Sequence, residues 1–403
     1  MRTWVRGGQV YDVHEAVYRR RDIEVADGRI VRLVDQGRPL AGDAVIDVDG
    51  AWLWPGLIDL HVHITMPTEA ANPDNPWRGR LPGEIAIYAA KAAERTLMGG
   101  ITTAREVGGW DYHEIAVRSA INRGLIKGPR LFCAGRLLSI TTATVDYYPG
   151  MYEVADGPEA VRVAARKQLA HGADFIKVMA TGAMTASEYE DARAIQYTLE
   201  ELKAAVAVAT ENYKYVVAHA HACAGIRNAA LAGCRTVEHG SFGDEEAYAL
   251  MAERGTYLVP TLCVVSAMLA DNQVSAGLPA HIHNRYLDFD DIHAENASLA
   301  RRTGVTIAMG TDAGTPGNHH GDNTQELVSM VRRSGMSARE AVVASTLSAA
   351  RALGREADLG SLAAGKFADV VGFREDPIAT IERVRDVRLV VKGGEVVRND
   401  LRA

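Results

Sequence analysis

The sequence predicts an α/β protein: a parallel (β/α)₈ (TIM) barrel with a small β-sandwich domain formed from both chain ends. Three observations predict this architecture. Short, almost continuously apolar runs recur along the middle of the 403-residue chain, helix-like stretches separate them, and both ends contain short strand-like segments with turns. Alternating strands and helices are typical of a parallel barrel, whose strands are buried on both faces.

The chain ends are the first and the last elements. Near the N-terminus, the turn-forming pair Asp27-Gly28 separates two strand-like runs, and near the C-terminus residues 368–373 and 387–396 have the same character. Neither end is long enough to bury a good core alone, and chain termini often lie close together. We therefore expect one β-sandwich domain from residues 1–54 and 357–403, and a barrel from residues 55–356.

The middle of the chain supplies the barrel elements in order. Eight apolar runs are expected as strands: 52–60, 102–107, 131–134, 175–179, 215–218, 236–238, 257–261 and 305–309. Helix-like stretches between them include 84–98, 158–170, 199–211 and 224–232. This order predicts that the C-terminal ends of the eight strands share one face, where such barrels carry their active sites.

Composition excludes several classes of protein. Hydrophobic content of 47%, charged content of 24% and a net charge of -7 fit an ordinary globular protein with no basic footprint for nucleic acid or an anionic membrane. The N-terminus does not resemble a signal peptide, and no apolar window suggests a membrane span. The cysteines lack paired spacing, which favours reduced thiols. We expect a cytoplasmic enzyme with a small-molecule substrate.

Metal-binding residue types occur where the predicted strands end. His61 and His63 are two apart in the first strand, so both imidazoles face the same side, and histidine is a common zinc ligand. Further ligand-capable groups lie in strands four, five, six and eight: Lys177, His219, His239 and Asp312. Chance would bring all six groups to one barrel face far less often than it would bring any single one.

The local sequence around these residues resembles the amidohydrolase superfamily. Within that superfamily it is most similar to the prolidase-like and imidazolonepropionase-like branch. The resemblance rests on Pro-Gly-Leu-Ile-Asp-Leu-His-Val-His at 55–63, Lys-Val-Met-Ala-Thr-Gly at 177–182, Glu-His-Gly at 238–240 and Gly-Thr-Asp-Ala-Gly-Thr-Pro at 310–316. It covers nearly the whole chain. It implies a metal-dependent hydrolase on a distorted (β/α)₈ barrel, and a homo-oligomer.

The resemblance also implies a role for each group. His61, His63 and Asp312 would bind a buried ion, His219 and His239 a more exposed one, and Lys177, carboxylated on its side-chain nitrogen, would bridge both. The cofactors implied are two divalent ions, zinc foremost, that share a hydroxide. Asp312 would be the catalytic residue, taking the proton of that hydroxide and delivering it to the leaving group.

Two assignments have alternatives. Lys177 alone would be an ordinary lysine at a barrel mouth; beside the other ligands we favour the carbamate. His221 lies two residues after His219 and could also face the metal, but we favour His219 because it stands where the strand first reaches the mouth. His221 is then expected behind the ligands. His293 lies in a polar insertion and is expected to be solvated.

Three loops bear on the substrate. After strand three the chain has Thr141-Thr142-Ala143 where many relatives have Gly-Gly-His, which puts a simple transfer of dipeptidase specificity in doubt. After strand four, Tyr189 or Arg193 could hold a substrate carboxylate, and an exposed helix-capping loop is an equal alternative. His320, in the loop after strand eight, is a further candidate for substrate contact.

The leading hypothesis is a binuclear hydrolase of an amide-like bond in an N-acyl amino acid, a dipeptide or a xenobiotic amide. The alternative is hydrolysis of a cyclic amide, urea, carbamate, ester or lactone by the same site. A deaminase would typically lack the bridging lysine. A non-catalytic scaffold on the same fold is disfavoured because all six groups are present.

Overall fold

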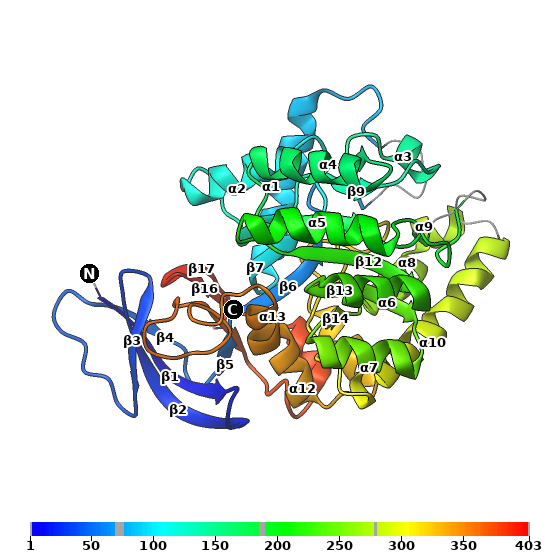
Figure 1. Cartoon of the computed structure of the whole chain (residues 1–403). Coiled ribbons are helices and arrows are strands. Elements are labelled where there is room, and N and C mark those ends of the chain that lie inside the picture. Colours follow the sequence, from blue (N-terminus) through cyan, green and yellow to red (C-terminus); the bar gives the residue numbers. More distant parts are fainter. Residues whose placement is uncertain (1, 69–75, 185–189, 278–279, 402–403) are drawn as a thin grey trace.

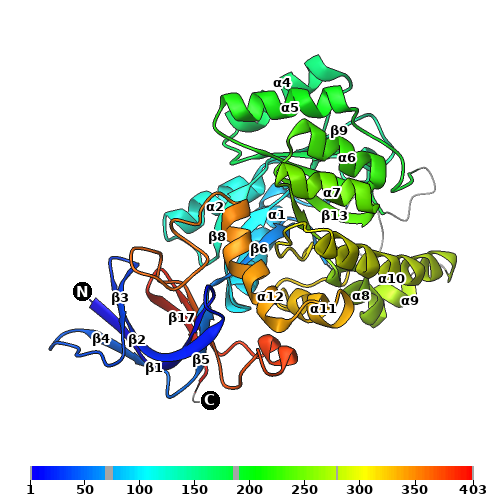
Figure 2. The ribbon, with the colours of Figure 1, turned by 60° about the horizontal axis from the view of Figure 1, so that its bottom comes forward.

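The computed structural model describes residues 2–68, 76–184, 190–277 and 280–401 of an α/β protein (Figure 1). A strand-rich part with both chain ends lies on one side, and the parallel strands with most helices lie on the other. Both views show this separation (Figure 1, Figure 2). Within the described part, no helix is both long enough and apolar enough to cross a membrane.

One eight-stranded sheet joins the two chain ends. Its strands follow the order β17-β16-β15-β5-β1-β2-β3, with β4 paired to β1. Their bounds are Arg2–Asp12 (β1), Val17–Ala26 (β2), Arg29–Val34 (β3), Ala44–Asp47 (β4), Trp52–Pro55 (β5), Val370–Phe373 (β15), Leu389–Lys392 (β16) and Glu395–Asn399 (β17). Val5, Ile23, Leu53, Val370 and Leu389 are completely buried in its core. The described end strands join in a single sheet, so the predicted sandwich is not confirmed, and the division into two domains stays a prediction.

The remaining strands pair in parallel. A six-stranded sheet has the order β10-β9-β11-β12-β13-β14, and a three-stranded sheet the order β6-β7-β8. Their bounds are Leu57–Val62 (β6), Ile101–Glu106 (β7), Arg130–Cys133 (β8), Leu137–Ser139 (β9), Tyr152–Val154 (β10), Ile176–Met179 (β11), Val216–Ala222 (β12), Thr236–Phe242 (β13) and Tyr257–Val259 (β14). Strands β6, β7, β11 and β12 are buried along their whole length, which explains their continuous apolar runs.

The first predicted strand is divided at Gly56. Residues before it belong to β5 in the end sheet, and residues after it form β6. A Cβ at Gly56 would lie 2.2 Å from Thr102 Oγ1 and 2.7 Å from Asp369 Cβ, so the chain crosses here without room for a side chain. The apolar run continues through the crossing, which is why the sequence pattern does not reveal it.

The prediction of an eighth strand at residues 305–309 is wrong, because these residues form no regular strand. Ile307 forms only an isolated bridge with Leu258. The reason is that its backbone bonds go to three different partners: Ala308 N donates to Leu258 O, Leu60 N donates to Met309 O, and Met309 N donates to Ala344 O. Residues 306–309 therefore lie between β14 and β6. On the other side, Asp174 N, just before β11, donates to Cys133 O of β8.

The helices follow the predicted stretches closely. The four predicted ones appear as Pro82–Met98 (α1), Pro158–Ala170 (α4), Leu199–Glu211 (α5) and Cys223–Ala232 (α6). Thr198 caps α5 and Glu201 bonds back to it, a capping box that fixes the start of the helix. The others are His113–Asn122 (α2), Thr144–Tyr147 (α3), Glu245–Arg254 (α7), Cys263–Ala270 (α8), Asn272–Gly277 (α9), Ala280–Arg302 (α10), Gln325–Arg333 (α11), Ala338–Val343 (α12) and Ala349–Ala352 (α13), with a π-helix Ala344–Ser348 and a 3₁₀-helix Ile381–Arg385.

The cysteines agree with the reduced state expected from their spacing. All four are free; Cys133, Cys234 and Cys263 are buried, and Cys223 is partly exposed. They pack as small apolar side chains.

Candidate metal centre

The six predicted groups, together with His221, border one cavity at the C-terminal ends of the parallel strands. The cavity has a volume of about 210 Å³. Its polar side chains include His61, His63, Lys177, His219, His221, His239 and Asp312. Each is at most 8% exposed. The structure thus brings these residues together at one cavity, and their roles as metal ligands stay a prediction.

His61, His63 and Asp312 form the first set, called here the Asp312 group. One ligand atom from each lies within 4.8 Å of the others. His61 Nε2 and His63 Nε2 are both 3.5 Å from Asp312 Oδ1, and this oxygen has no hydrogen-bond partner. Asp312 N donates to His61 O, which brings the segment after residues 305–309 against the end of β6.

The protein fixes which nitrogen of His61 and His63 faces Asp312. His63 Nδ1 lies 3.0 Å from the carbonyl oxygen of Gly108, and His61 Nδ1 lies 2.8 Å from Glu238 Oε2. A carbonyl and a carboxylate only accept, so each Nδ1 carries the proton and each Nε2 keeps a lone pair. Both lone pairs are therefore available to a cation.

Glu238 on β13 is held ionised in the core. Burial alone would raise its pKa, but the Arg105 guanidinium and the His61 hydrogen bond outweigh it and lower the pKa below its usual range. Arg105 Nη2 donates to Glu238 Oε1 at 2.8 Å, and Arg105 Nε donates to Leu60 O at 2.6 Å. A carboxylate behind a metal-facing histidine orients the ring and increases its basicity.

Asp59 fastens β6 to the segment that carries Asp312. Its Oδ1 accepts from His61 N and Thr311 N, and its Oδ2 accepts from Thr311 Oγ1 and Asn323 Nδ2. The side chain is completely buried. Asp59 therefore has a structural role, because its hydrogen bonds set the spacing between His61 and Asp312.

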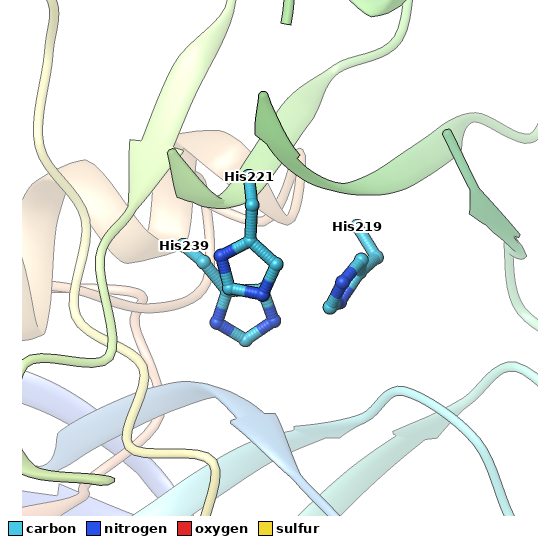
Figure 3. A group of neighbouring side chains, drawn as sticks. All are labelled: His219, His221 and His239. Carbon is cyan, nitrogen blue, oxygen red and sulfur yellow. The ribbon is translucent and has the colours of Figure 1, made fainter. Parts of the chain in front are cut away.

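His219, His221 and His239 form the second set, called here the three-histidine group (Figure 3). His219 Nε2 donates to the carbonyl oxygen of Gly182, so its Nδ1 is free. His239 Nδ1 is bonded to Thr261 Oγ1, and His221 Nδ1 to Ser241 Oγ. In each ring one nitrogen is hydrogen-bonded to the protein, and the other is left without such a bond.

The three rings differ in orientation. The rings of His219 and His239 are inclined by 67° with centroids 4.5 Å apart, whereas those of His221 and His239 are stacked at 17° and 4.8 Å. Figure 3 shows His221 and His239 over one another and His219 to the side. A cation lies near the plane of an imidazole that binds it. An ion in the plane of one stacked ring lies well outside the plane of the other.

His239 and Asp312 both have left-handed backbones. Their φ angles are +70° and +61°, a region that side-chain-bearing residues rarely adopt. His293 Nε2–H donates to the carbonyl oxygen of His239 at 3.2 Å and so supports one of these conformations. Backbone strain of this kind is concentrated at functional sites.

Burial determines the charge states of the site. It lowers the pKa of His63 to about 4 and that of His219 to about 3, so these imidazoles are neutral at neutral pH. It lowers the pKa of Lys177 to about 8 and raises that of Asp312 to about 8. Lys177 Nζ has no hydrogen-bond partner, and its charge affects the histidines of both groups.

The expectation for His293 is wrong. It lies on α10, is 1% exposed, packs on Phe289 and borders the cavity. Glu238 and Arg105 were not among the predicted site residues either. The signal for them was a charged residue within an otherwise apolar strand, where an ion needs a partner.

Of the three residues predicted to contact the substrate, the structure describes Arg193 and His320, which have different surroundings. Tyr189 lies outside the described residues. Arg193 is exposed, with its guanidinium 4.7 Å from the centre of the Phe242 ring. His320 is buried, with Nδ1 bonded to Thr96 Oγ1 and Nε2 donating to the carbonyl oxygen of His63, so its ring supports β6 from behind.

Comparisons with known proteins agree with these observations. The sequence profile described as the Amidohydrolase family matches residues 52–397. The chain is 33% identical to ochratoxinase of Aspergillus niger over 372 residues, which span 86% of this chain and 75% of that protein.

Solved structures have the same fold. A prolidase complexed with N-methylphosphonate-L-proline superposes with a TM-score of 0.89 at 29% identity, covering 99% of this chain and 100% of the other. A Xaa-Pro dipeptidase with bound methionine in its active site gives 0.88 at 31% identity, with 99% and 100% covered. The A. niger ochratoxinase gives 0.85 at 30% identity, with 99% and 96% covered.

Proposed function

The chain belongs to the amidohydrolase family and is a hydrolase of carbon–nitrogen bonds, and from this premise we propose that it cleaves amide bonds at a centre of two divalent cations. The substrate is an N-acyl amino acid, a dipeptide or a xenobiotic amide. The observation that carries the proposal is the convergence of the Asp312 group, the three-histidine group and Lys177 on one cavity.

The side chains fit two cations. Asp312 Oδ1 and Lys177 Nζ are buried without hydrogen-bond partners, an arrangement that is costly unless another group satisfies them. Neutral Lys177, favoured by burial, would react with carbon dioxide to give a carbamate and a proton, which converts a neutral amine into an anionic oxygen ligand. We propose that His61, His63 and Asp312 hold one ion, His219 and His239 the other, and carboxylated Lys177 both. Imidazole-rich sites of this kind suit zinc.

The ring orientations support His219 rather than His221 as the ligand from β12. His219 is inclined to His239, so an ion could lie near the planes of both rings, and one nitrogen of each ring is unoccupied. His221 is stacked on His239 and suits a neighbouring role, with its ring oriented by Ser241.

The chemistry follows from these positions. Bound there, two cations polarise the scissile carbonyl and lower the pKa of the attacking water toward neutrality. Asp312 accepts the proton of that water at its carboxylate and delivers it to the leaving nitrogen. Glu238 and Asp59 keep His61 and Asp312 in register while the proton moves.

A closed barrel explains why the groups converge. We propose that the parallel strands close through the bonds that join β8 to β11, residues 306–309 to β14, and β6 to residues 306–309. Closure directs the C-terminal ends of all these strands to one mouth. The end sheet would then be a separate domain, residues 1–54 with 357–403, beside a barrel of residues 55–356.

Metal analysis and one lysine variant test the proposal. We expect two zinc ions per chain after reconstitution, loss of amide hydrolysis with a chelator, and recovery on adding zinc. Lys177→Ala should lose at least about 100-fold in kcat/KM and regain part of it with added short carboxylic acids that replace the carbamate. Lys203→Ala, on the outer helix α5, is the matched control. One metal per chain, or a fully active Lys177→Ala, would contradict the two-cation centre.

A further inference from the structure

The wall of the cavity beyond the metal centre is rich in methionine. Five of the chain's 11 methionines border it: Met66, Met151, Met179, Met184 and Met268. Met66, Met151 and Met179 belong to one buried hydrophobic cluster, and Met184 and Met268 pack against a second, so two apolar clusters from different parts of the chain meet at this wall. Methionine is unbranched and polarisable, and it adapts to apolar ligands of varied shape.

Aromatic rings complete this wall. Tyr148, Tyr152, Tyr286 and Phe289 border the same cavity. Among the described residues of its lining, Lys177 and Asp312 are the sole lysine, arginine, aspartate or glutamate side chains. Both belong to the metal centre, so the rest of the described wall offers no ionic partner to a ligand.

The size of the cavity allows a ring to enter. Its volume is about 210 Å³, and an apolar protein cavity of roughly 150 Å³ is enough to hold benzene. An uncharged apolar group would exchange water for methionine and aromatic contacts there. A carboxylate or ammonium would lose its hydration without gaining an ionic partner among the described residues of this wall.

We propose that the substrate carries a bulky, uncharged, apolar group, an aryl or branched alkyl group, beside its scissile bond, and that this group occupies the methionine-rich wall. The inference rests on the proposed function and narrows its substrate class. Acidic dipeptides and acyl groups that end in a carboxylate are poor substrates on this view.

Three N-methyl amides that differ in one terminal group test the proposal. They are N-methyl-3-phenylpropanamide, N-methylsuccinamide and N-methylsuccinamic acid, which end in phenyl, neutral carboxamide and carboxylate. The last two have nearly the same shape, so their comparison isolates charge. The matching ethyl ketones, in which CH₂ replaces the amide N–H, cannot be hydrolysed and report binding alone; they are called here the phenyl, carboxamide and carboxylate ketones.

We expect the zinc-loaded protein to bind the phenyl ketone on the order of 10- to 100-fold more tightly than the carboxamide ketone, and the carboxylate ketone most weakly. The kcat/KM values of the three amides should rank in the same order. Carboxylate binding equal to or tighter than phenyl binding overturns the proposal. The expected binding order without hydrolysis of any amide supports the apolar wall and overturns the proposed amide hydrolysis instead.

A charge placed in the wall provides a second test. Met268 on α8 is partly exposed, so Met268→Lys replaces it without burying the new side chain completely. This variant should improve carboxylate-ketone binding relative to phenyl-ketone binding by at least about 10-fold, while Met268→Leu should keep the original order. An unchanged order in a folded Met268→Lys protein overturns the proposal. If that variant fails to fold, the ligand series on the native protein decides.

Discussion

At the scale of single residues, each histidine of the Asp312 group and of the three-histidine group has one nitrogen occupied by the protein. Backbone carbonyls accept hydrogen bonds from His63 and His219, hydroxyls bond to His221 and His239, and Glu238 accepts from His61. The types and positions of the six groups were predictable because strand ends and ligand chemistry are local properties. Their hydrogen-bond partners come from other strands and could not be read from spacing.

Glu238 is expected to control the affinity for metal. Glu238→Gln removes the charge behind His61 and leaves buried Arg105 without its anionic partner, so zinc affinity should fall about 10- to 100-fold. Competition with a chromophoric chelator measures this directly, without turnover. Glu246→Gln, at an exposed ion pair with Arg227, should leave zinc affinity unchanged. Equal affinity in the native and Glu238→Gln proteins would show that Glu238 does not support the site.

At the scale of elements, the four helices named from the sequence were predictable to within two residues. Two errors have tertiary causes. The run 52–60 crosses between two sheets at Gly56, and residues 305–309 divide their backbone bonds among three partners. The prediction that His293 is solvated was wrong because most residues around it on α10 are polar, whereas its own side chain is buried.

Asp59 joins two of these elements, and its loss should be measurable as stability. Asp59→Ala leaves the buried amides of His61 and Thr311 without an acceptor, which should lower the free energy of unfolding of the metal-free protein by about 3 kcal/mol. Urea unfolding measures the change. Asp288→Ala, at an exposed position of α10, should change it by no more than about 0.5 kcal/mol. A similar result for both variants would contradict a joining role for Asp59.

At the scale of the whole molecule, the chain encloses many neutral histidines. Besides His63 and His219, burial lowers the pKa of His293 and His320 to about 4. The fold places these buried, neutral rings close to one cavity, so their effect on stability belongs to the whole molecule. The homo-oligomer implied by family resemblance stays a prediction.

Acid should therefore act against the buried histidines of the metal-free protein. An unfolded chain binds protons on these histidines below about pH 6.5, whereas the folded chain binds them only near pH 3 to 4. The contribution of each ring to the free energy of unfolding then falls as the pH falls through this window, by up to about 1.4 kcal/mol per pH unit, whereas Asp312 and Glu326, whose carboxyl pKa burial raises to about 8, contribute with the opposite sign. NMR titration of the imidazole protons of the folded protein between pH 7 and pH 5 follows the histidines separately from the carboxyls. A ring among these four that takes up its proton near pH 6.5 would contradict the neutral, buried state.

The two groups of the metal centre differ in how far apart their members lie along the chain. The three-histidine group is drawn from residues 219–239, whereas the Asp312 group needs residues 61, 63 and 312. A nascent chain emerging from the ribosome thus possesses the imidazoles of the second group well before it has Asp312. An incomplete translation product that ends between these points has the imidazoles of both groups, His61 and His63 included, but lacks the Asp312 carboxylate.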